Sequence, residues 1–249
     1  MRFQVDLHTH TVACSHAYST LGEYVEQAVD TGISMFATTD HGPTLADGPH
    51  KWHFSNLTVV PRIIRNVAVL RGIEANITED GCLDIEDYIR EKLDIVLAAL
   101  HSNYTPTNEK EHTRLLIKVI ESGKVDILAH PGARLYPIDY EEVLACAKEH
   151  NVAIEINAST SVNARFGCHD NCVKIAKIAA RLGNAISLGS DAHIASFLGC
   201  FDESIKVLED AGLGYENVIN TSPAKVLDFL ESRGHAPIKE LREYFTPFK

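Results

Sequence analysis

The chain alternates seven short apolar segments with segments of helical periodicity, and this alternation is what most constrains its fold. Short apolar runs followed by longer amphipathic stretches are typical of β-then-α units. The expected strands cover residues 2–7, 33–38, 67–73, 93–100, 125–129, 152–156 and 185–189. The expected helices cover about 20–32, 108–123, 139–151, 170–182, 199–211 and 223–232, and a Gly/Pro/His-rich loop covers 42–54.

Apolar strands that alternate with helices predict a parallel sheet covered by helices. Seven such units favour a single α/β domain over residues 1–249, folded as a closed (β/α)7 TIM-like barrel. An open, doubly wound sheet is the alternative. No GxGxxG or GxxxxGK[ST] motif follows an expected strand, so the sequence gives no support to a nucleotide-binding fold.

Capping signals predict where three of the helices begin. Thr20 and Glu23 have the spacing of a capping box, in which each side chain binds a backbone N–H group at the helix start. Asn108 and Asp139 are each followed by a glutamate three residues later. These signals are local, so they predict helix boundaries without reference to the tertiary fold.

Side chains that can bind metal ions follow most of the expected strands. They are His8, His10, His16, His41, Glu74, His101, His130, Asp191 and His193. Because the carboxyl ends of parallel strands meet on one rim of a barrel, we expect these side chains to gather there. His8 and His10 alternate with Thr9, so in extended chain both imidazoles point to the same side. The sequence therefore predicts a metal centre on this rim.

The number and type of these ligands favour three divalent ions. Glu74 has two oxygens and can bridge two ions, so the set offers about ten bonds, whereas catalytic zinc uses roughly three protein ligands. Imidazoles favour zinc, with manganese or iron as alternatives, over magnesium or calcium. The remaining histidines are interpreted as surface residues, except His53, which is left undecided; the surface set is His50, His112, His150, His169 and His235.

The bulk properties exclude several classes of protein. The formal net charge of −11 argues against stable binding to nucleic acid, although bound cations would still allow a small anionic substrate. The first residues lack a signal-peptide pattern, and no apolar stretch reaches the length of a membrane span. The six cysteines contain no CxxC pair and are expected to be reduced thiols. We therefore expect a cytoplasmic protein.

Most of the candidate ligands lie in short motifs. These are Asp6-Leu7-His8-Thr9-His10, Thr39-Asp40-His41, Gly72-Ile73-Glu74, Leu100-His101, His130-Pro131-Gly132 and Gly189-Ser190-Asp191-Ala192-His193. With this combination the chain resembles the PHP (polymerase and histidinol phosphatase) superfamily over almost its whole length. Its length and local sequence are most similar to the small bacterial probable phosphatases of the YcdX type. The resemblance implies a distorted seven-stranded barrel, a trinuclear metal centre and a homo-oligomer, with a trimer as the expectation.

The resemblance also implies a role for each ligand. By position it assigns His8, His10, Glu74 and Asp191 to a first ion, His16, His41 and His193 to a second, and Glu74, His101 and His130 to a third. Clustered divalent ions lower the pKa of bound water, so a metal-bound hydroxide can attack a phosphate ester at neutral pH. We therefore expect a metal-dependent phosphoesterase that hydrolyses a small phosphomonoester, with Asp191 and His193 assisting proton transfer.

Side chains around the metal ligands are also candidates for the site. Arg165 lies beyond the sixth strand and is the candidate substrate-binding residue, because a guanidinium can bind phosphate with two hydrogen bonds. Phe166 departs from the YcdX-type pattern, which has a basic residue there, and Arg134 and Lys51 are weaker candidates for phosphate binding. Asp6 and Asp40 stand in the same short motifs as His8 and His41 and are candidates for orienting these ligands.

The sequence is compatible with three other functions. A PHP-type nuclease or phosphodiesterase would use the same metals, but the acidic charge and the lack of a partner domain argue against it. A non-catalytic metal-binding or stress-response protein would have the same ligands without turnover. An amidohydrolase is chemically possible, although no lysine stands at an expected strand end to be carboxylated.

Overall fold

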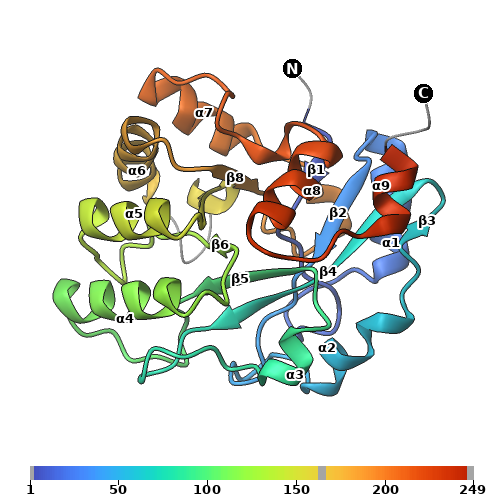
Figure 1. Cartoon of the computed structure of the whole chain (residues 1–249), viewed down its shortest axis with the longest axis horizontal. Coiled ribbons are helices and arrows are strands. Elements are labelled where there is room, and N and C mark those ends of the chain that lie inside the picture. The colour runs from blue at the N-terminus through green and yellow to red at the C-terminus, as the bar shows by residue number, and fades with distance from the viewer. Residues whose placement is uncertain (1–2, 162–166, 246–249) are drawn as a thin grey trace.

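The computed structural model describes residues 3–161 and 167–245, and Figure 1 shows helices arranged around a central sheet. The strands are β1 (Val5–Asp6), β2 (Met35–Thr38), β3 (Ile63–Ile64), β4 (Val67–Asn76), β5 (Ile95–Ala99), β6 (Ile127–Leu128), β7 (Ala153–Asn157) and β8 (Ile186–Gly189). The α-helices are α1 (Leu21–Thr31), α2 (Trp52–Asn56), α3 (Asp87–Arg90), α4 (Glu109–Glu121), α5 (Tyr140–Glu149), α6 (His169–Leu182), α7 (Asp202–Ala211), α8 (Pro223–Ser232) and α9 (Lys239–Phe245). Among the helices of the described residues, none has the length and apolar character needed to cross a membrane.

Seven strands pair in parallel in the order β1-β2-β4-β5-β6-β7-β8, which is also their order in the chain. A doubly wound sheet would reverse its order at a switch point, whereas a sequential order is that of a TIM-like barrel. The prediction of a seven-stranded barrel is therefore confirmed. The sequence did not predict β3, which pairs antiparallel with β4 through a turn at Arg65 and Asn66, both with positive φ.

The barrel is nearly closed, and its seam lies between β1 and β8. Asn220, in a 3₁₀ turn before α8, bridges this seam with its side chain. Its carbonyl oxygen accepts a hydrogen bond from the backbone N–H of Leu188 (2.7 Å), and its amide donates to the backbone oxygens of Val5 (3.2 Å) and Leu188 (2.9 Å). Beyond the strand ends, Thr9 and Ala192 form a parallel bridge. The side chain of Asn220 thus links β1 and β8 themselves, and the bridge between Thr9 and Ala192 links the chain beyond their ends.

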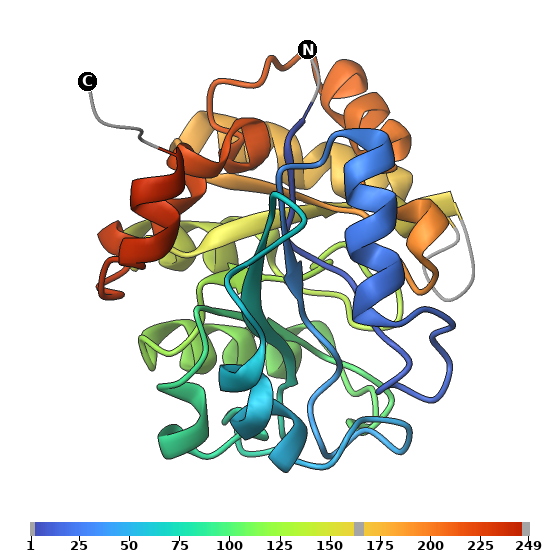
Figure 2. The same cartoon turned by 90° about the vertical axis from the view of Figure 1, so that its right-hand side faces the viewer.

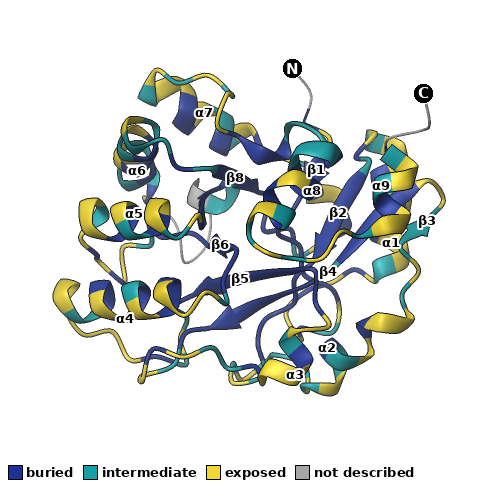
Figure 3. Ribbon diagram, viewed as in Figure 1, coloured by how far each residue is buried: buried dark blue, intermediate teal, exposed yellow. Residues whose placement is uncertain are grey.

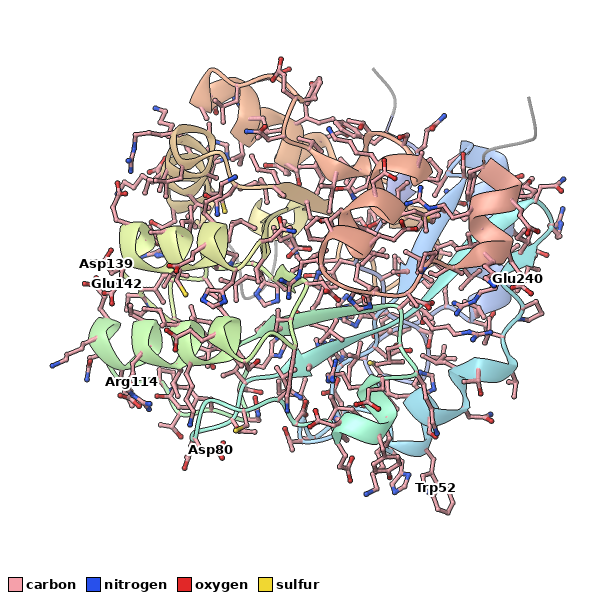
Figure 4. The ribbon with its side chains drawn as sticks, viewed as in Figure 1. Trp52, Asp80, Arg114, Asp139, Glu142 and Glu240 are labelled. Carbon is pink, nitrogen blue, oxygen red and sulfur yellow. The ribbon has the colours of Figure 1, made fainter. Side chains whose placement is uncertain are left out.

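Helices α4 to α7 pack side by side along one flank of the barrel, and α1 packs against β2 and β4 on another (Figures 1 and 2). The predicted caps of α1 and α5 are confirmed: Thr20 accepts a hydrogen bond from Glu23 N (3.3 Å), and Asp139 accepts one from Glu142 N (3.1 Å). Asp139 and Glu142 lie at the outer edge of the molecule (Figure 4). Gly32 ends α1 with a φ of 74°, which glycine adopts without a steric penalty.

The apolar core has an outer and an inner part. Leu115 and Ile175 belong to the outer part, between the sheet and helices α4 to α7. Val226 of α8 joins the inner part, which fills the barrel. Arg233, directly after α8, donates a hydrogen bond to the backbone oxygen of Val125 (2.6 Å), so α8 ends where β6 begins. Figure 3 shows the result: buried strands inside, and helices whose outer faces are exposed.

Several predicted boundaries are wrong. The predicted loop 42–54 ends in helix α2, which begins at Trp52, and the side chain of Trp52 projects outward (Figure 4). Strand β4 continues past Glu74, so this residue lies within the strand rather than after it. Strand β6 has two residues instead of five, and His130 shortly after it has a φ of 32°, outside the range of a strand. The sequence did not predict the short helices α3 and α9.

The surface interpretation of the remaining histidines is wrong for His112, which is buried. Its Nδ1 donates to the backbone oxygen of Pro137 (2.9 Å), and its Nε2 accepts from the backbone N–H of Thr107 (2.9 Å). Both ring nitrogens are therefore used to join α4 to the loops beside it. His235 is partly buried and lies 2.8 Å from Asp126 at the start of β6.

Candidate metal centre

The structure brings the nine candidate ligands together at one end of the barrel. Glu74 lies in β4; the others follow strands, namely His8, His10 and His16 after β1, His41 after β2, His101 after β5, His130 after β6, and Asp191 with His193 after β8. Six of the nine are buried, although all are polar: His8, His10, His41, Glu74, His130 and Asp191. This is the rim on which the carboxyl ends of parallel strands meet.

The carboxylate of Glu74 lies at the centre of the cluster and is fully buried. Five imidazole nitrogens lie within 3.6 Å of its oxygens. Next to Oε2 are Nδ1 of His41 (2.8 Å), Nε2 of His8 (3.3 Å) and Nε2 of His10 (3.6 Å), and next to Oε1 are Nε2 of His130 (2.6 Å) and Nε2 of His101 (3.2 Å). Each oxygen thus faces its own group of imidazoles, an arrangement that suits a carboxylate shared between two ions.

A second carboxylate, Asp191, faces the histidines that follow β1. Its Oδ1 lies 3.4 Å from Nε2 of His8 and 3.1 Å from Nε2 of His10. The ring of His10 also lies 4.3 Å, centroid to centroid, from the rings of both His41 and His193. Among the described residues, four triplets have possible ligand atoms within 4.8 Å of one another, and two of them are His8 with His10 and Asp191, and His10 with His41 and His193.

His16 lies at the outer edge of the cluster, with about half of its side chain exposed. Its Nδ1 pairs with the carboxylate of Asp47. Its ring lies 5.3 Å from that of His41 and 4.5 Å from that of His193, the two histidines that the resemblance assigns to the same ion. The structure therefore places all nine candidates in one continuous group.

Burial and mutual charge set the protonation states of the central groups. Burial raises the pKa of Glu74, but the imidazoles around it, His101 foremost, outweigh burial and hold that pKa well below its usual range. Burial lowers the pKa of His10 well below its usual range, and the neighbouring His41 lowers it further. Glu74 is thus ionised and His10 neutral, the states in which these two side chains bind a metal, whereas in His8 the neighbouring carboxylates outweigh burial and raise the pKa well above its usual range.

The cluster contains buried polar atoms without hydrogen-bond partners among the described residues. They are Nε2 of His8, Nδ1 of His10, Nδ1 of His41, Oε2 of Glu74 and Nε2 of His101. Nine such side-chain atoms occur in the described part of the chain, so this small region holds more than half of them. Buried polar atoms are normally hydrogen-bonded. Imidazole nitrogens and carboxylate oxygens are also the atoms with which proteins bind zinc and similar ions. The residues present therefore fit a centre of divalent transition-metal ions.

Three supporting side chains were not predicted from the sequence. Glu155 lies 2.7 Å from Nδ1 of His8, Asn76 Oδ1 lies 2.7 Å from Nδ1 of His101, and Asp47 pairs with His16 as described above. Glu155 is the one charged residue of strand β7 and stands between two isoleucines, and this anomaly could have revealed it. The other two are recognisable only from their contacts.

Asp6 and Asp40 act on the backbone of the ligand-bearing loops. Asp6 accepts a hydrogen bond from the backbone N–H of His8 (3.3 Å), and burial raises its pKa to about 6. Asp40 accepts from the backbone N–H of Thr11 (2.6 Å) and lies 3.0 Å from Nε2 of His53. His53 lines a separate groove of about 630 Å³, so it lies behind Asp40 and outside the ligand cluster.

Of the candidates for phosphate binding, Lys51 and Arg134 lie among the described residues. Arg165, together with its neighbour Phe166, lies outside the described residues. Lys51 forms an ion pair with Glu86. Arg134 is exposed in the loop after β6. Lys51 thus has a carboxylate partner of its own.

Comparison with known proteins places this fold and ligand set in a family. The chain matches the PHP domain over residues 6–247, and it therefore belongs to the PHP family. The protein is 47% identical over 249 residues to a "Probable phosphatase" of Shewanella amazonensis, covering 99% of each chain. It is 50% identical over 247 residues to a "Probable phosphatase" of Shewanella frigidimarina, covering 98% of each chain.

Solved structures share the fold at much lower sequence identity. Histidinol phosphate phosphatase from Lactococcus lactis, complexed with zinc, L-histidinol and phosphate, has a TM-score of 0.62 at 15% identity and covers 86% of this chain and 95% of its own. A putative histidinol phosphatase from Listeria monocytogenes has a TM-score of 0.57 at 15% identity, covering 85% of this chain and 98% of its own. These likenesses confirm the PHP barrel.

Proposed function

We propose that the protein is a metal-dependent phosphatase that hydrolyses small phosphomonoesters at a site for three divalent ions. Zinc is the proposed ion, with manganese or iron as alternatives. The observation that carries the proposal is the buried carboxylate of Glu74 with five imidazole nitrogens within 3.6 Å. A cluster of this kind is a poor core element, because unpaired buried polar atoms are destabilising, but it is a good ligand set.

Each proposed ion has its own set of ligands, and two of the sets share Glu74. His8, His10, Glu74 and Asp191 would hold the first, His16, His41 and His193 the second, and Glu74, His101 and His130 the third. When bound, clustered divalent ions lower the pKa of water and neutralise the charge of a phosphate ester. Neither a nucleophilic serine nor a nucleophilic cysteine is then required.

Asp191 and His193 are the proposed residues for proton transfer. Nδ1 of His193 donates a hydrogen bond to the backbone oxygen of Asp191 (2.9 Å), so its Nε2 carries the lone pair. Oδ1 of Asp191 faces the imidazoles of His8 and His10, while Nδ2 of Asn157 lies 3.3 Å from Oδ2. His193 is therefore oriented by its own loop, and Asp191 by a neighbouring strand.

The relatives support a phosphatase. Proteins named "Probable phosphatase" are about half identical to this chain over nearly its whole length. The structural neighbour from Lactococcus lactis was solved with zinc, L-histidinol and phosphate, which makes a small phosphorylated metabolite the natural class of substrate. Arg165 is proposed to contact the phosphate, so Arg165→Ala is expected to raise KM more than it lowers kcat.

The test combines metal analysis with turnover. Protein purified without chelators should contain close to three divalent ions per chain and release phosphate from p-nitrophenyl phosphate. Asp191→Ala should lower kcat/KM by more than the roughly 10–100-fold that loss of an outer hydrogen-bond partner costs. His169→Ala is the matched control, because this histidine pairs with Asp210 on the outside of the barrel. A metal-loaded protein that is inert to a broad panel of phosphoesters would refute the proposal.

The same preparation distinguishes the alternative functions. Incubation with labelled single-stranded DNA should give no cleavage, because the net charge of −11 opposes binding of a polyanion. Degradation of the DNA without hydrolysis of phosphomonoesters would favour a nuclease. Full metal content without any turnover would favour a metal-binding protein.

A further inference from the structure

Glu155 is a buried carboxylate in the middle of β7, and three of its contacts lead to the ligand cluster. Its Oε1 accepts a hydrogen bond from Nδ1 of His8 (2.7 Å). Its Oε2 accepts from the backbone N–H of His130 (2.8 Å) and from Nδ2 of Asn157 (3.0 Å). Burying a carboxylate is unfavourable unless it is paired. A buried glutamate in this strand therefore points to a role in the ligand cluster that it contacts.

The hydrogen bond to His8 determines which ring nitrogen faces the cluster. Because Nδ1 carries the proton that is donated to Glu155, the lone pair of the neutral ring lies on Nε2. That Nε2 lies 3.3 Å from Glu74 Oε2 and 3.4 Å from Asp191 Oδ1 and has no hydrogen-bond partner among the described residues. Glu155 therefore leaves His8 in the tautomer that can bind a metal in the cluster.

The other contacts of Glu155 act on two ligands in unusual backbone conformations. His130 has a φ of 32° and Asp191 a φ of 56°, in the left-handed region that non-glycine residues avoid unless their surroundings impose it. Glu155 binds the backbone N–H of His130 directly. Asn157 links Glu155 to Asp191, with Nδ2 3.0 Å from Glu155 Oε2 and 3.3 Å from Asp191 Oδ2.

The neighbouring strand leaves space for this carboxylate. Gly189 at the end of β8 pairs with Asn157 of β7. A Cβ atom at Gly189 would lie 1.9 Å from Glu155 Oε1 and 3.0 Å from the Cβ of His8. A larger residue at this position is therefore incompatible with the observed place of the carboxylate.

We propose that Glu155 is a positioning residue that holds ligands from three strands, His8 after β1, His130 after β6 and Asp191 after β8, in the arrangement that binds the metal ions. The inference rests on the proposed function, because it assumes that the cluster binds metals. Glu155 is expected to touch neither substrate nor metal. Its effect reaches the site through the histidine ring, the backbone turn and the Asn157 bridge.

The test compares Glu155→Gln with wild type and with Asp126→Asn. Asp126 is also a buried carboxylate that accepts a backbone hydrogen bond, from Val96 N (2.9 Å), but it lies at the opposite end of the barrel. Glutamine keeps the size of Glu155 and cannot accept hydrogen bonds with both ends. Competition with a chromophoric chelator should show the tightest zinc dissociation constant raised about 10–100-fold in Glu155→Gln and unchanged in Asp126→Asn.

Two further readouts separate positioning from a purely structural role. The visible absorption spectrum of the cobalt-substituted protein reports ligand geometry, and it should change in Glu155→Gln but not in Asp126→Asn. The melting temperature of the metal-free protein should fall no further in Glu155→Gln than in Asp126→Asn. If Glu155→Gln does not fold, Asn157→Ala removes one arm of the network and should weaken zinc binding about tenfold.

The outcomes are distinguishable. A wild-type protein that binds no metal would refute the proposed function itself. A wild type that binds zinc and a Glu155→Gln protein with the same affinity and the same cobalt spectrum would overturn the role of Glu155 alone. Loss of stability in the metal-free variant with unchanged zinc affinity would also overturn it, as would unchanged affinity in Asn157→Ala.

Discussion

Truncation of Asn220 should strongly destabilise the protein, because one side chain bridges the seam of the barrel. Asn220 is fully buried and makes three hydrogen bonds, to Leu188 N, Leu188 O and Val5 O. Asn220→Ala removes all three and leaves a buried N–H and two buried carbonyl groups without this partner. At about 1 kcal/mol per hydrogen bond, plus about 1–3 kcal/mol for an unpaired buried N–H, the expected loss is about 4–6 kcal/mol.

Asn184→Ala is the matched control for this measurement. Asn184 is equally buried, but it donates a single hydrogen bond, to Leu144 O (2.9 Å), and its Oδ1 has no partner among the described residues. Its truncation should cost about 1 kcal/mol. Urea unfolding followed by circular dichroism, with chelator present to remove any contribution from metals, gives both free energies of unfolding. Equal losses in the two variants would show that Asn220 does not hold the seam as argued.

An ion pair, a helix cap and the proposed metal ions each give one further prediction. The hydrogen bond with Asp126 raises the pKa of His235 against the effect of burial, and Arg233 opposes this rise while Asp94 favours it. The His235–Asp126 pair should therefore stabilise the protein fully below about pH 6.5, and this stabilisation should fade as pH rises through the raised pKa of His235. Urea titrations should find that this pH dependence is missing in His235→Gln. Thr20→Ala removes the cap of α1 and should lower the free energy of unfolding by about 1 kcal/mol in the same assay, whereas no change would contradict the capping argument. Metal removal should lower the melting temperature, with about 2.7 kcal/mol lost if the free ion had been present at 100 times its Kd, and identical melting curves with and without chelator would argue against a bound ion.

The sequence predicted the features that local chemistry determines. The caps at Thr20 and Asp139 need only a side chain and a backbone N–H three residues away, so their signals lie in short segments. The barrel was predictable because its strands are buried on both faces and read as apolar runs. The grouping of the nine ligand candidates followed from the same topology, since parallel strands end on one rim.

The features that the sequence did not reveal depend on contacts between distant residues. Glu155 and His8 are 147 positions apart, and the seam contact between Asn220 and Val5 spans 215 positions. His112 is a different case, because it lies on the same helical stripe as Leu115 and Val119, and this periodicity predicts that it is buried. The surface position expected for His112 is wrong because a polar ring on this apolar stripe is buried when both of its nitrogens find hydrogen-bond partners. The short length of β6 was unpredictable because the positive φ of His130, shortly after this strand, follows from the tertiary structure.

The spread of the ligand cluster along the chain has a consequence for the order in which the protein is made. His8 and His193 are 185 positions apart, and at roughly 5–20 residues per second the ribosome needs about 10–40 s to reach the second after the first. During that interval the early histidines emerge without their later partners. Whatever the cluster binds can therefore be captured in full only after β8 and the loop that follows it have left the exit tunnel.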